Sequence, residues 1–284
     1  MKPQLFITIL LLIVSINVAS ADVGVVYDAH IAWKTAFEKA DIAAVSEIWS
    51  HAADTTLITL GGKKKNGFKE IQAELFLSFQ LTGETEIDES NLLITLSPLR
   101  EGRLGDKASA TSDYRWSPLP NVPLKTTELY RKENGGWKMI AQDGTGKVLP
   151  PLRPDDEIRV REQVQQANDA LAGADIDKLA ALTADNDFTY VALNGTVHQK
   201  LDEVVIGADL EKIRKVLLEV IYLIDDVATA HLTLTLTGNN ERNVQFAIKD
   251  FQLTKLNFAP KSLVVRPKGK LTTIWARIKT QTPG

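Results

Sequence analysis

An internal repeat is the feature of this sequence that most narrows what the chain can fold into. Residues 40–42 read Ala-Asp-Ile, and the same run returns at residues 174–176. Further along, Asp54–Gly62 aligns with Asp187–Gly195, and each is an Asp-led run of strand-forming residues that ends in glycine. A repeat of this length indicates duplicated domains, because solenoid repeats have periods of only about 20–50 residues. The chain therefore predicts two tandem copies of one small domain.

A proline-rich segment separates the two copies. Residues 149–154 read Leu-Pro-Pro-Leu-Arg-Pro, and prolines at this density disfavour regular structure and make a stiff, extended spacer. Three acidic residues follow at 155–157, which places negative charge where the start of a helix favours it. We therefore expect a first domain over residues 22–148, a linker over residues 149–154 and a second, more divergent domain over residues 155–284.

Residues 1–21 have the pattern of a secretory signal peptide. Lys2 supplies a positive charge, Leu5–Val14 is an almost unbroken apolar run, and residues 19–21 read Ala-Ser-Ala, a small-residue cleavage site. An uncleaved membrane anchor is the alternative, but the apolar run is shorter than the roughly 20 residues that span a bilayer. We expect cleavage before Asp22, a secreted or periplasmic location, and no membrane attachment after cleavage.

The composition argues against several classes of function. The chain contains no cysteine, which excludes disulfides, thiolate metal sites and a cysteine nucleophile, and which suits bacterial export. The net charge is −3, and the basic run Lys63–Lys65 is expected at a solvated hairpin tip, so we expect no nucleic-acid partner. The sequence has no phosphate-cradling glycine loop, dinucleotide fingerprint or Gly-x-Ser-x-Gly motif, and we expect no cofactor.

The apolar spacing of the first copy predicts three helices, one short strand after the second helix, and then antiparallel strands. Asp41 is a favourable N-cap for the second helix. Each long strand has one apolar face, which the helices must cover. The expected fold class is α+β, with two tandem cone-shaped domains, each of three helices packed on a curved antiparallel sheet. Beyond the helix that Asp41 caps, the expected ranges are helices over residues 25–39 and 67–80, and strands over residues 54–60, 91–96, 107–116, 125–131 and 137–143.

The second copy predicts a similar helical half and a different end. Leu201–Val220 is expected to form one long helix, and His231–Thr237 alternates as a strand with its leucines toward a core. The in-out alternation shifts after the next strand, which predicts a β-bulge near Asp250. Residues 267–269, Pro-Lys-Gly, are expected to connect the final strands.

Copy one resembles the nuclear-transport-factor-2-like superfamily, which includes ketosteroid isomerases, scytalone dehydratases and SnoaL-like polyketide cyclases. The resemblance is carried by residues 40–42 after an aromatic first helix, by the Asn-Gly pair at residues 66–67, and above all by the closing hairpin of Thr127–Lys132 and Gly136–Asp143. It covers about residues 25–145. Copy two shares the helical half of this pattern and lacks the Gly-Trp hairpin.

The resemblance implies an apolar pocket in each copy, between the helices and the inner face of the sheet. The isomerases of this superfamily place a carboxylate base and acidic hydrogen-bond donors in that pocket, but no residue of this chain can be matched to those positions, and we assign no catalytic residue. The pocket candidates are Trp33, Phe37, Trp49, Asp54, Tyr114, Trp116, Tyr130, Asp143 and Tyr190.

Several candidates also have a purely structural interpretation. The tryptophans and Phe37 suit a core or a pocket wall. Glu128 shares a strand face with Tyr130, yet Glu128 and Asp143 are expected on the outer or rim face. An inward Asp54 or Asp143 would serve as a general base, whereas a local turn role explains why an aspartate recurs at Asp54 and Asp187.

The histidines do not indicate a metal site. None is spaced three or four residues from another, and none has a convincing carboxylate partner at the spacing of a metal site. We therefore expect no bound metal. The four histidines are His30, His51, His198 and His231.

Three functions remain open at this point. The leading hypothesis is an exported, non-catalytic module that binds a small apolar molecule in one or both pockets. The second is a cofactor-independent SnoaL-like or isomerase-like enzyme, which requires a buried carboxylate facing the pocket. The third is a structural or interaction protein, in which the two copies pair within the chain or the chain forms a homodimer through its sheets.

Overall fold

The computed structural model describes residues 24–97, 105–184 and 188–259. The expected signal peptide, Asp187 and the connection at residues 267–269 lie outside these ranges. None of the helices in the described ranges combines the length and apolar character that crossing a bilayer requires.

The first half of the chain contains three helices and six strands in the described residues. A helix over residues 24–38 comes first. The elements that follow are α2 (Ile42–Ile48), β1 (Thr56–Ile58), β2 (Lys64–Asn66), α3 (Phe68–Thr82), β3 (Ile87–Leu96), β4 (Lys107–Trp116), β5 (Leu119–Glu133) and β6 (Gly136–Asp143).

The second half repeats this order of elements. Its elements are α4 (Pro154–Ala172), α5 (Ile176–Leu182), β7 (Thr189–Val191), β8 (Val197–His198), α6 (Glu203–Leu210), β9 (Ile213–Ile224), β10 (Val227–Leu236), β11 (Glu241–Lys249) and β12 (Gln252–Asn257). The linker is one residue shorter than expected, because Pro154 is the first residue of α4. Proline is favourable at this position, since the first amide of a helix has no hydrogen-bond partner within the helix.

The repeated Ala-Asp-Ile run forms the same helix start in both halves. Ala40 and Ala174 have left-handed backbones, with φ of 52° and 51°, which turn the chain out of the preceding helix. Asp41 then accepts hydrogen bonds from the first amides of α2, and Asp175 does the same for α5. The sequence match therefore marks a helix N-cap that is used twice.

The expected long helix over Leu201–Val220 is wrong. The helix α6 ends at Leu210, and the central strand β9 begins at Ile213. The end of β9, Val220–Ile224, packs against a core on each face, so it is an unbroken apolar run that lacks the alternation of a half-buried strand. The irregularity expected near Asp250 is present: the pairing of β11 with β12 shifts register between Ala247 and Ile248, and Asp250 and Phe251, both with positive φ, form the turn between the two strands.

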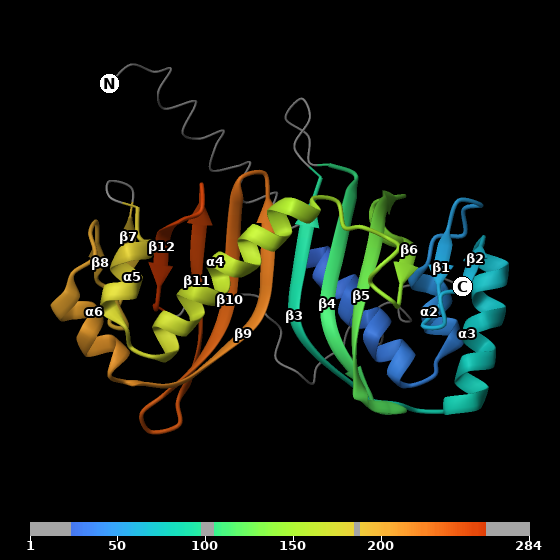
Figure 1. Cartoon of the computed structure of the whole chain (residues 1–284), viewed down its shortest axis with the longest axis horizontal. Coiled ribbons are helices and arrows are strands. Elements are labelled where there is room, and N and C mark those ends of the chain that lie inside the picture. Colours follow the sequence, from blue (N-terminus) through green and yellow to red (C-terminus); the bar gives the residue numbers. More distant parts are fainter. Residues whose placement is uncertain (1–23, 98–104, 185–187, 260–284) are drawn as a thin grey trace, which may run out of the picture.

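The strands of the described residues join into one twelve-stranded sheet with the order β2-β1-β6-β5-β4-β3-β9-β10-β11-β12-β7-β8 (Figure 1). The two halves meet where β3 pairs in parallel with β9, with Leu93, Ile94 and Thr95 opposite Ile221, Tyr222 and Leu223. The halves are thus joined edge to edge. Counted outward from this seam, the strand order of the first half, β3-β4-β5-β6-β1-β2, matches that of the second half, β9-β10-β11-β12-β7-β8, strand by equivalent strand.

The helices of the two halves cover opposite faces of this sheet. Ile94 belongs to the core under the helix of residues 24–38, whereas the next residue, Thr95, bonds to Glu157 of α4. Neighbouring residues of a strand point to opposite faces. Figure 1 shows α4 crossing the strands β9–β11.

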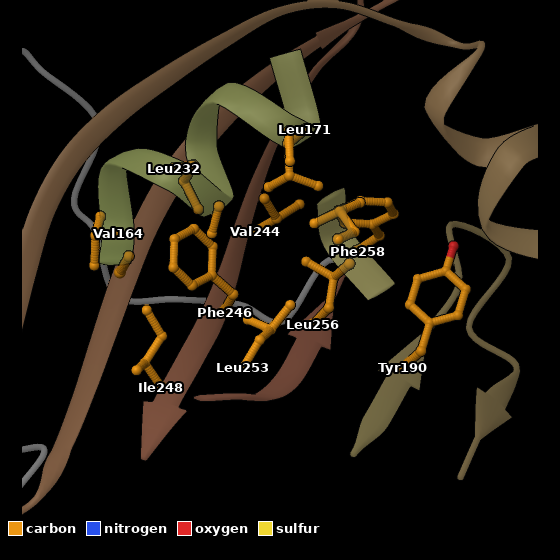
Figure 2. Packing of buried hydrophobic residues seen from close by; sticks show 14 of the residues in the cluster. Val164, Leu171, Tyr190, Leu232, Val244, Phe246, Ile248, Leu253, Leu256 and Phe258 are labelled. Carbon is orange, nitrogen blue, oxygen red and sulfur yellow. The ribbon is translucent and has the colours of Figure 1, made fainter. Parts of the chain in front are cut away.

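The two hydrophobic cores share residues at the seam. Leu93 of β3 packs in the core of the second half, and Val220 of β9 packs in the core of the first half. Figure 2 shows the second core, where Val164 and Leu171 of α4 lie over Phe246 and its neighbours. Each half therefore contributes a strand to the other's core.

Candidate functional site

A buried hydrogen-bond network joins the helix of residues 24–38 to β3 and β5. One ring nitrogen of His30, Nδ1, lies 2.8 Å from Glu128 Oε2, and the other, Nε2, lies 2.9 Å from Glu89 Oε1. Tyr130 donates its hydroxyl to Glu128 Oε2 at 2.5 Å. The side chains of His30 and Glu128 are 0% exposed, and that of Glu89 is 10% exposed.

This network corrects one prediction. Glu128 was expected on the outer or rim face, and it lies on the inner face, fully buried. His30 has no carboxylate partner at a metal-site spacing in the sequence, and its two partners in the fold are 59 and 98 residues away. The shared strand face of Glu128 and Tyr130 was the available signal, because a large aromatic side chain on a half-buried strand marks the face that packs inward.

The electrostatics fix the protonation states of His30, Glu89 and Tyr130. Burial acts to lower the pKa of His30, but the charges and hydrogen bonds of Glu128 and Glu89 raise it to about 10. Burial acts to raise the pKa of Glu89, but the His30 charge and hydrogen bonds lower it to about 2. Burial and the charge of Glu128 raise the pKa of Tyr130, so its hydroxyl stays protonated and donates. At neutral pH an imidazolium therefore lies between two acidic side chains.

One carboxylate oxygen of this network has no partner. Within the described residues, Glu128 Oε1 is buried and makes no hydrogen bond. Thr126, two residues away on the same face of β5, also has a buried hydroxyl without a partner, as do the indole nitrogens of Trp33 and Trp116. On the neighbouring strand β4, Ser112 stands opposite Thr126 and Ala110 stands opposite Glu128. The unpartnered side chains of Thr126 and Glu128 therefore lie on the inner face of the sheet, where β4 and β5 adjoin.

Three of the aromatic candidates form a wall at this face. Phe37 has its ring centroid 5.5 Å from Trp33 and 6.1 Å from Trp116, and Phe79 of α3 packs edge-on against it at 5.2 Å. Trp33 is also 6.1 Å from His30. The structure therefore brings Trp33, Phe37 and Trp116 next to the buried network.

The other candidates lie in different surroundings. Trp49 is buried in the first core, and its backbone bridges to Met139. Asp54 is exposed and pairs with Arg131 at 2.7 Å. Tyr190 belongs to the second half, where its hydroxyl donates to the buried Asp209.

Asp143 and Tyr114 hold the segment that follows β6. Asp143 is buried and accepts hydrogen bonds from the amides of Thr145, Val148 and Leu149, so its oxygens are occupied. Tyr114 reaches the carbonyl of Gly144 at 3.5 Å and lines an open cavity of about 1100 Å³. Burial and the charges of Glu128 and Asp143 raise the pKa of Tyr114.

Comparisons with known proteins give likenesses of structure alone. No family model and no curated protein matches this chain. An NTF2-like protein of unknown function from Pseudomonas putida is similar in structure, with 18% identity over 43% of this chain and 84% of that chain and a TM-score of 0.36. An NTF2-like protein from Cytophaga hutchinsonii has 14% identity over 42% of this chain and 93% of that chain and a TM-score of 0.32.

The chain is similar to NTF2-like proteins. Other similar structures have the provisional names of a dehydratase from Streptomyces avermitilis and a ketosteroid isomerase from Shewanella frigidimarina, with 21% and 19% identity and TM-scores of 0.38 and 0.35. They cover 43% and 41% of this chain and 94% and 90% of their own. The helices and mixed sheet agree with the expected α+β class, and the likeness says nothing about activity.

The second half of the chain packs the same helix without the polar network. Counting back eleven residues from the matched N-caps Asp41 and Asp175 places Val164 where His30 stands. Val164 lies in a core of apolar side chains that includes Phe246 and Ile248 (Figure 2). A helix can therefore pack on this kind of sheet without buried charges.

The polar network is not arranged as a metal centre. Among the described residues, no group of three or more histidine, cysteine, aspartate or glutamate side chains is placed to hold a metal ion. The two carboxylates bind different nitrogens of the His30 ring, so they do not converge on one point. The arrangement suits hydrogen bonding and proton exchange.

Proposed function

We propose that the first half is a small-molecule-binding module whose polar anchor is Glu128. The observation that carries this proposal is the buried Oε1 atom of Glu128, which has no partner among the described residues while Oε2 is held by His30 and Tyr130. The network fixes the carboxylate in place and leaves one oxygen available to a hydrogen-bond donor.

The energetics favour a role beyond packing. An unsatisfied buried polar group costs about 1–3 kcal/mol, and more when it is charged. Buried ionic groups are often replaced by apolar ones without loss of stability, and the second half has an apolar residue, Val164, at the position of His30. Retaining a costly polar group where the fold does not need it is typical of a functional site.

The surrounding groups define the class of ligand. Its hydrogen-bond donor, a hydroxyl or an amine, would bond to Glu128 Oε1. The unpartnered indole N–H groups of Trp33 and Trp116 would donate to an acceptor on the same molecule. The wall of Trp33, Phe37 and Trp116 offers flat apolar surface. A small aromatic or alicyclic alcohol or amine that also contains a carbonyl or ether oxygen meets all three requirements.

A thermal-shift screen followed by native mass spectrometry tests this proposal. The library would pair each alcohol or amine with an analogue in which hydrogen replaces the donor group. We expect donor compounds to raise the Tm, Glu128→Gln to abolish the difference between each pair, and the matched control Asp54→Asn, at an exposed carboxylate, to keep it. The proposal would be refuted if no donor compound in the library bound, or if the Tm difference between each pair were the same in Glu128→Gln as in the wild type.

A second candidate function is proton transfer on a hydrophobic substrate. It is favoured by the continuous chain from Tyr130 through Glu128 and His30 to Glu89, in which Glu89 is the member with partial solvent exposure. Such a chain would exchange protons between the interior and solvent. Incubation of a panel of cyclic ketones in D₂O, followed by NMR, would detect it as deuterium uptake next to the carbonyl. Uptake that is equal in the wild type and His30→Val would exclude it.

We further propose that the protein is exported and that its halves are tandem NTF2-like domains. The signal pattern of residues 1–21 supports export, and the repeated order of elements supports duplication. Expression in a bacterium, with N-terminal sequencing of the periplasmic fraction, should give a chain that begins at Asp22. A chain that retains Met1 in the cytoplasm would contradict export.

A further inference from the structure

Two adjoining cavities lie on the face of the first sheet half that is opposite the buried network. They have volumes of about 1100 Å³ and about 490 Å³ and share Lys125, Gly146, Lys147 and Val148 as walls. The smaller one is lined by Thr111 and Thr127, whose strand neighbours Ala110 and Glu128 face the network. The segment after β6 therefore crosses this outer face and divides one groove into two.

The groove has an unusual share of exposed aliphatic surface. Leu60 and Val122 line the larger cavity, Ile158 lines the smaller one, and Val148 lines both. These side chains are 37% to 65% exposed, so their apolar surface faces the groove or solvent. Large aliphatic groups gathered around a concavity mark a binding surface more often than scattered ones do.

The charges of the groove are mixed, with four cationic and three acidic side chains along its two cavities. Asp88 stands opposite Arg115 on the neighbouring strand, and Asp113, which stands opposite Lys125, accepts a hydrogen bond from Asn91 at 2.9 Å. In the smaller cavity, Glu157 accepts hydrogen bonds from Thr95 and Thr111.

Lys125 and Lys147 form the shared wall, and no ion pair is seen for either within the described ranges. The chain crosses Lys125 at Gly146, where a Cβ atom would come within 2.8 Å of the lysine stem. Gly146 thus packs directly on the stem of Lys125, and both lysines line both cavities.

We propose that this groove binds an anionic amphiphile, an alkyl chain that ends in a carboxylate. The head group would lie between the ammonium groups of Lys125 and Lys147, and the chain would lie against Val148, Val122 and Leu60. The larger cavity exceeds the roughly 300–1,000 Å³ typical of small-molecule sites, so it has room for the chain. The groove is on the other face of the sheet from Glu128, so this site is separate from the proposed interior site.

Isothermal titration calorimetry and native mass spectrometry with dodecanoate and dodecanol test the proposal on the full chain. The two ligands have the same alkyl chain and differ in the charge of the head group. We expect dodecanoate to bind the wild type at least tenfold more tightly than dodecanol. The double variant Lys125→Glu/Lys147→Glu should weaken dodecanoate binding at least tenfold and leave dodecanol unchanged.

Three further variants separate the contributions. Val148→Asp, at an exposed position, should weaken both ligands, and Lys69→Glu, on the surface of α3, is the matched charge control and should change neither. Glu128→Gln should leave dodecanoate binding unchanged, which separates this site from the interior one. Failure of dodecanoate to bind the wild type, or unchanged binding by Lys125→Glu/Lys147→Glu, would overturn the proposal.

Discussion

Replacing His30 with valine, the residue that the second half has at this position, should destabilise the first half severely. His30 is fully buried, and both of its ring nitrogens bond to acidic side chains. Removing one partner of a buried ion pair costs about 3–5 kcal/mol, because the remaining charge is left uncompensated. His30→Val also leaves Glu128 with Tyr130 as its remaining partner, so we expect a loss of about 3–5 kcal/mol in the free energy of unfolding.

The same reasoning predicts a rescue. In the triple variant His30→Val/Glu128→Leu/Tyr130→Phe, the uncompensated carboxylate and the hydroxyl that bonded to it are both gone. Glu89 remains, but its side chain is partly exposed and can be solvated. We expect the triple variant to be at least about 2 kcal/mol more stable than His30→Val alone, since apolar replacement of buried ionic groups is often neutral or stabilising.

Urea unfolding followed by tryptophan fluorescence measures these changes in the free energy of unfolding of the first half. Four of the five tryptophans lie in the first half, and Trp275 lies outside the described residues. Circular dichroism in parallel would reveal whether the second half unfolds separately. A loss below about 1 kcal/mol for His30→Val, or a triple variant no more stable than the single one, would refute the buried charge network.

Three other perturbations test the structure elsewhere. The His30 contribution to stability is complete below pH 6.5 and is lost as the pH rises through about 10, and the Glu89 contribution is present above pH 4.5 and is lost as the pH falls through about 2. The Tm should therefore peak near pH 4.5–6.5 in the wild type and depend less on pH in His30→Val, as measured by calorimetry. Asp41→Ala removes the N-cap of α2 and should cost about 1 kcal/mol in urea unfolding, whereas an unchanged midpoint would mean that the cap is dispensable. Glu157→Leu leaves the buried hydroxyls of Thr95 and Thr111 without their acceptor and should cost about 2–4 kcal/mol, with Glu157→Gln much milder, and equal losses in the two variants would contradict this account.

The sequence contains enough information for the architecture of the first half and too little for its polar interior. The strand over residues 107–116 has the expected bounds, because its alternation and flanking turns are local features. β9 was mistaken for helix because its end, which is covered on both faces, lacks alternation, and nothing local indicates that two halves will meet there. The hydrogen bond between His30 and Glu128 joins residues that are 98 apart in the sequence, and it forms only because the helix of residues 24–38 packs across β5.

The parallel pairing of β3 with β9 explains why the chain has two separate candidate sites. Equivalent strands that pair in parallel place the helices of the two halves on opposite faces of one sheet, and α4 consequently reaches over β3 and β4 of the first half. The interior network uses first-half residues alone, whereas the smaller outer cavity combines Thr111 and Thr127 of the first half with Ile158 and Arg161 of α4. That cavity therefore exists because the halves are joined, and a fragment that ends before Pro154 would retain Glu128 and His30 but would lack one wall of the groove.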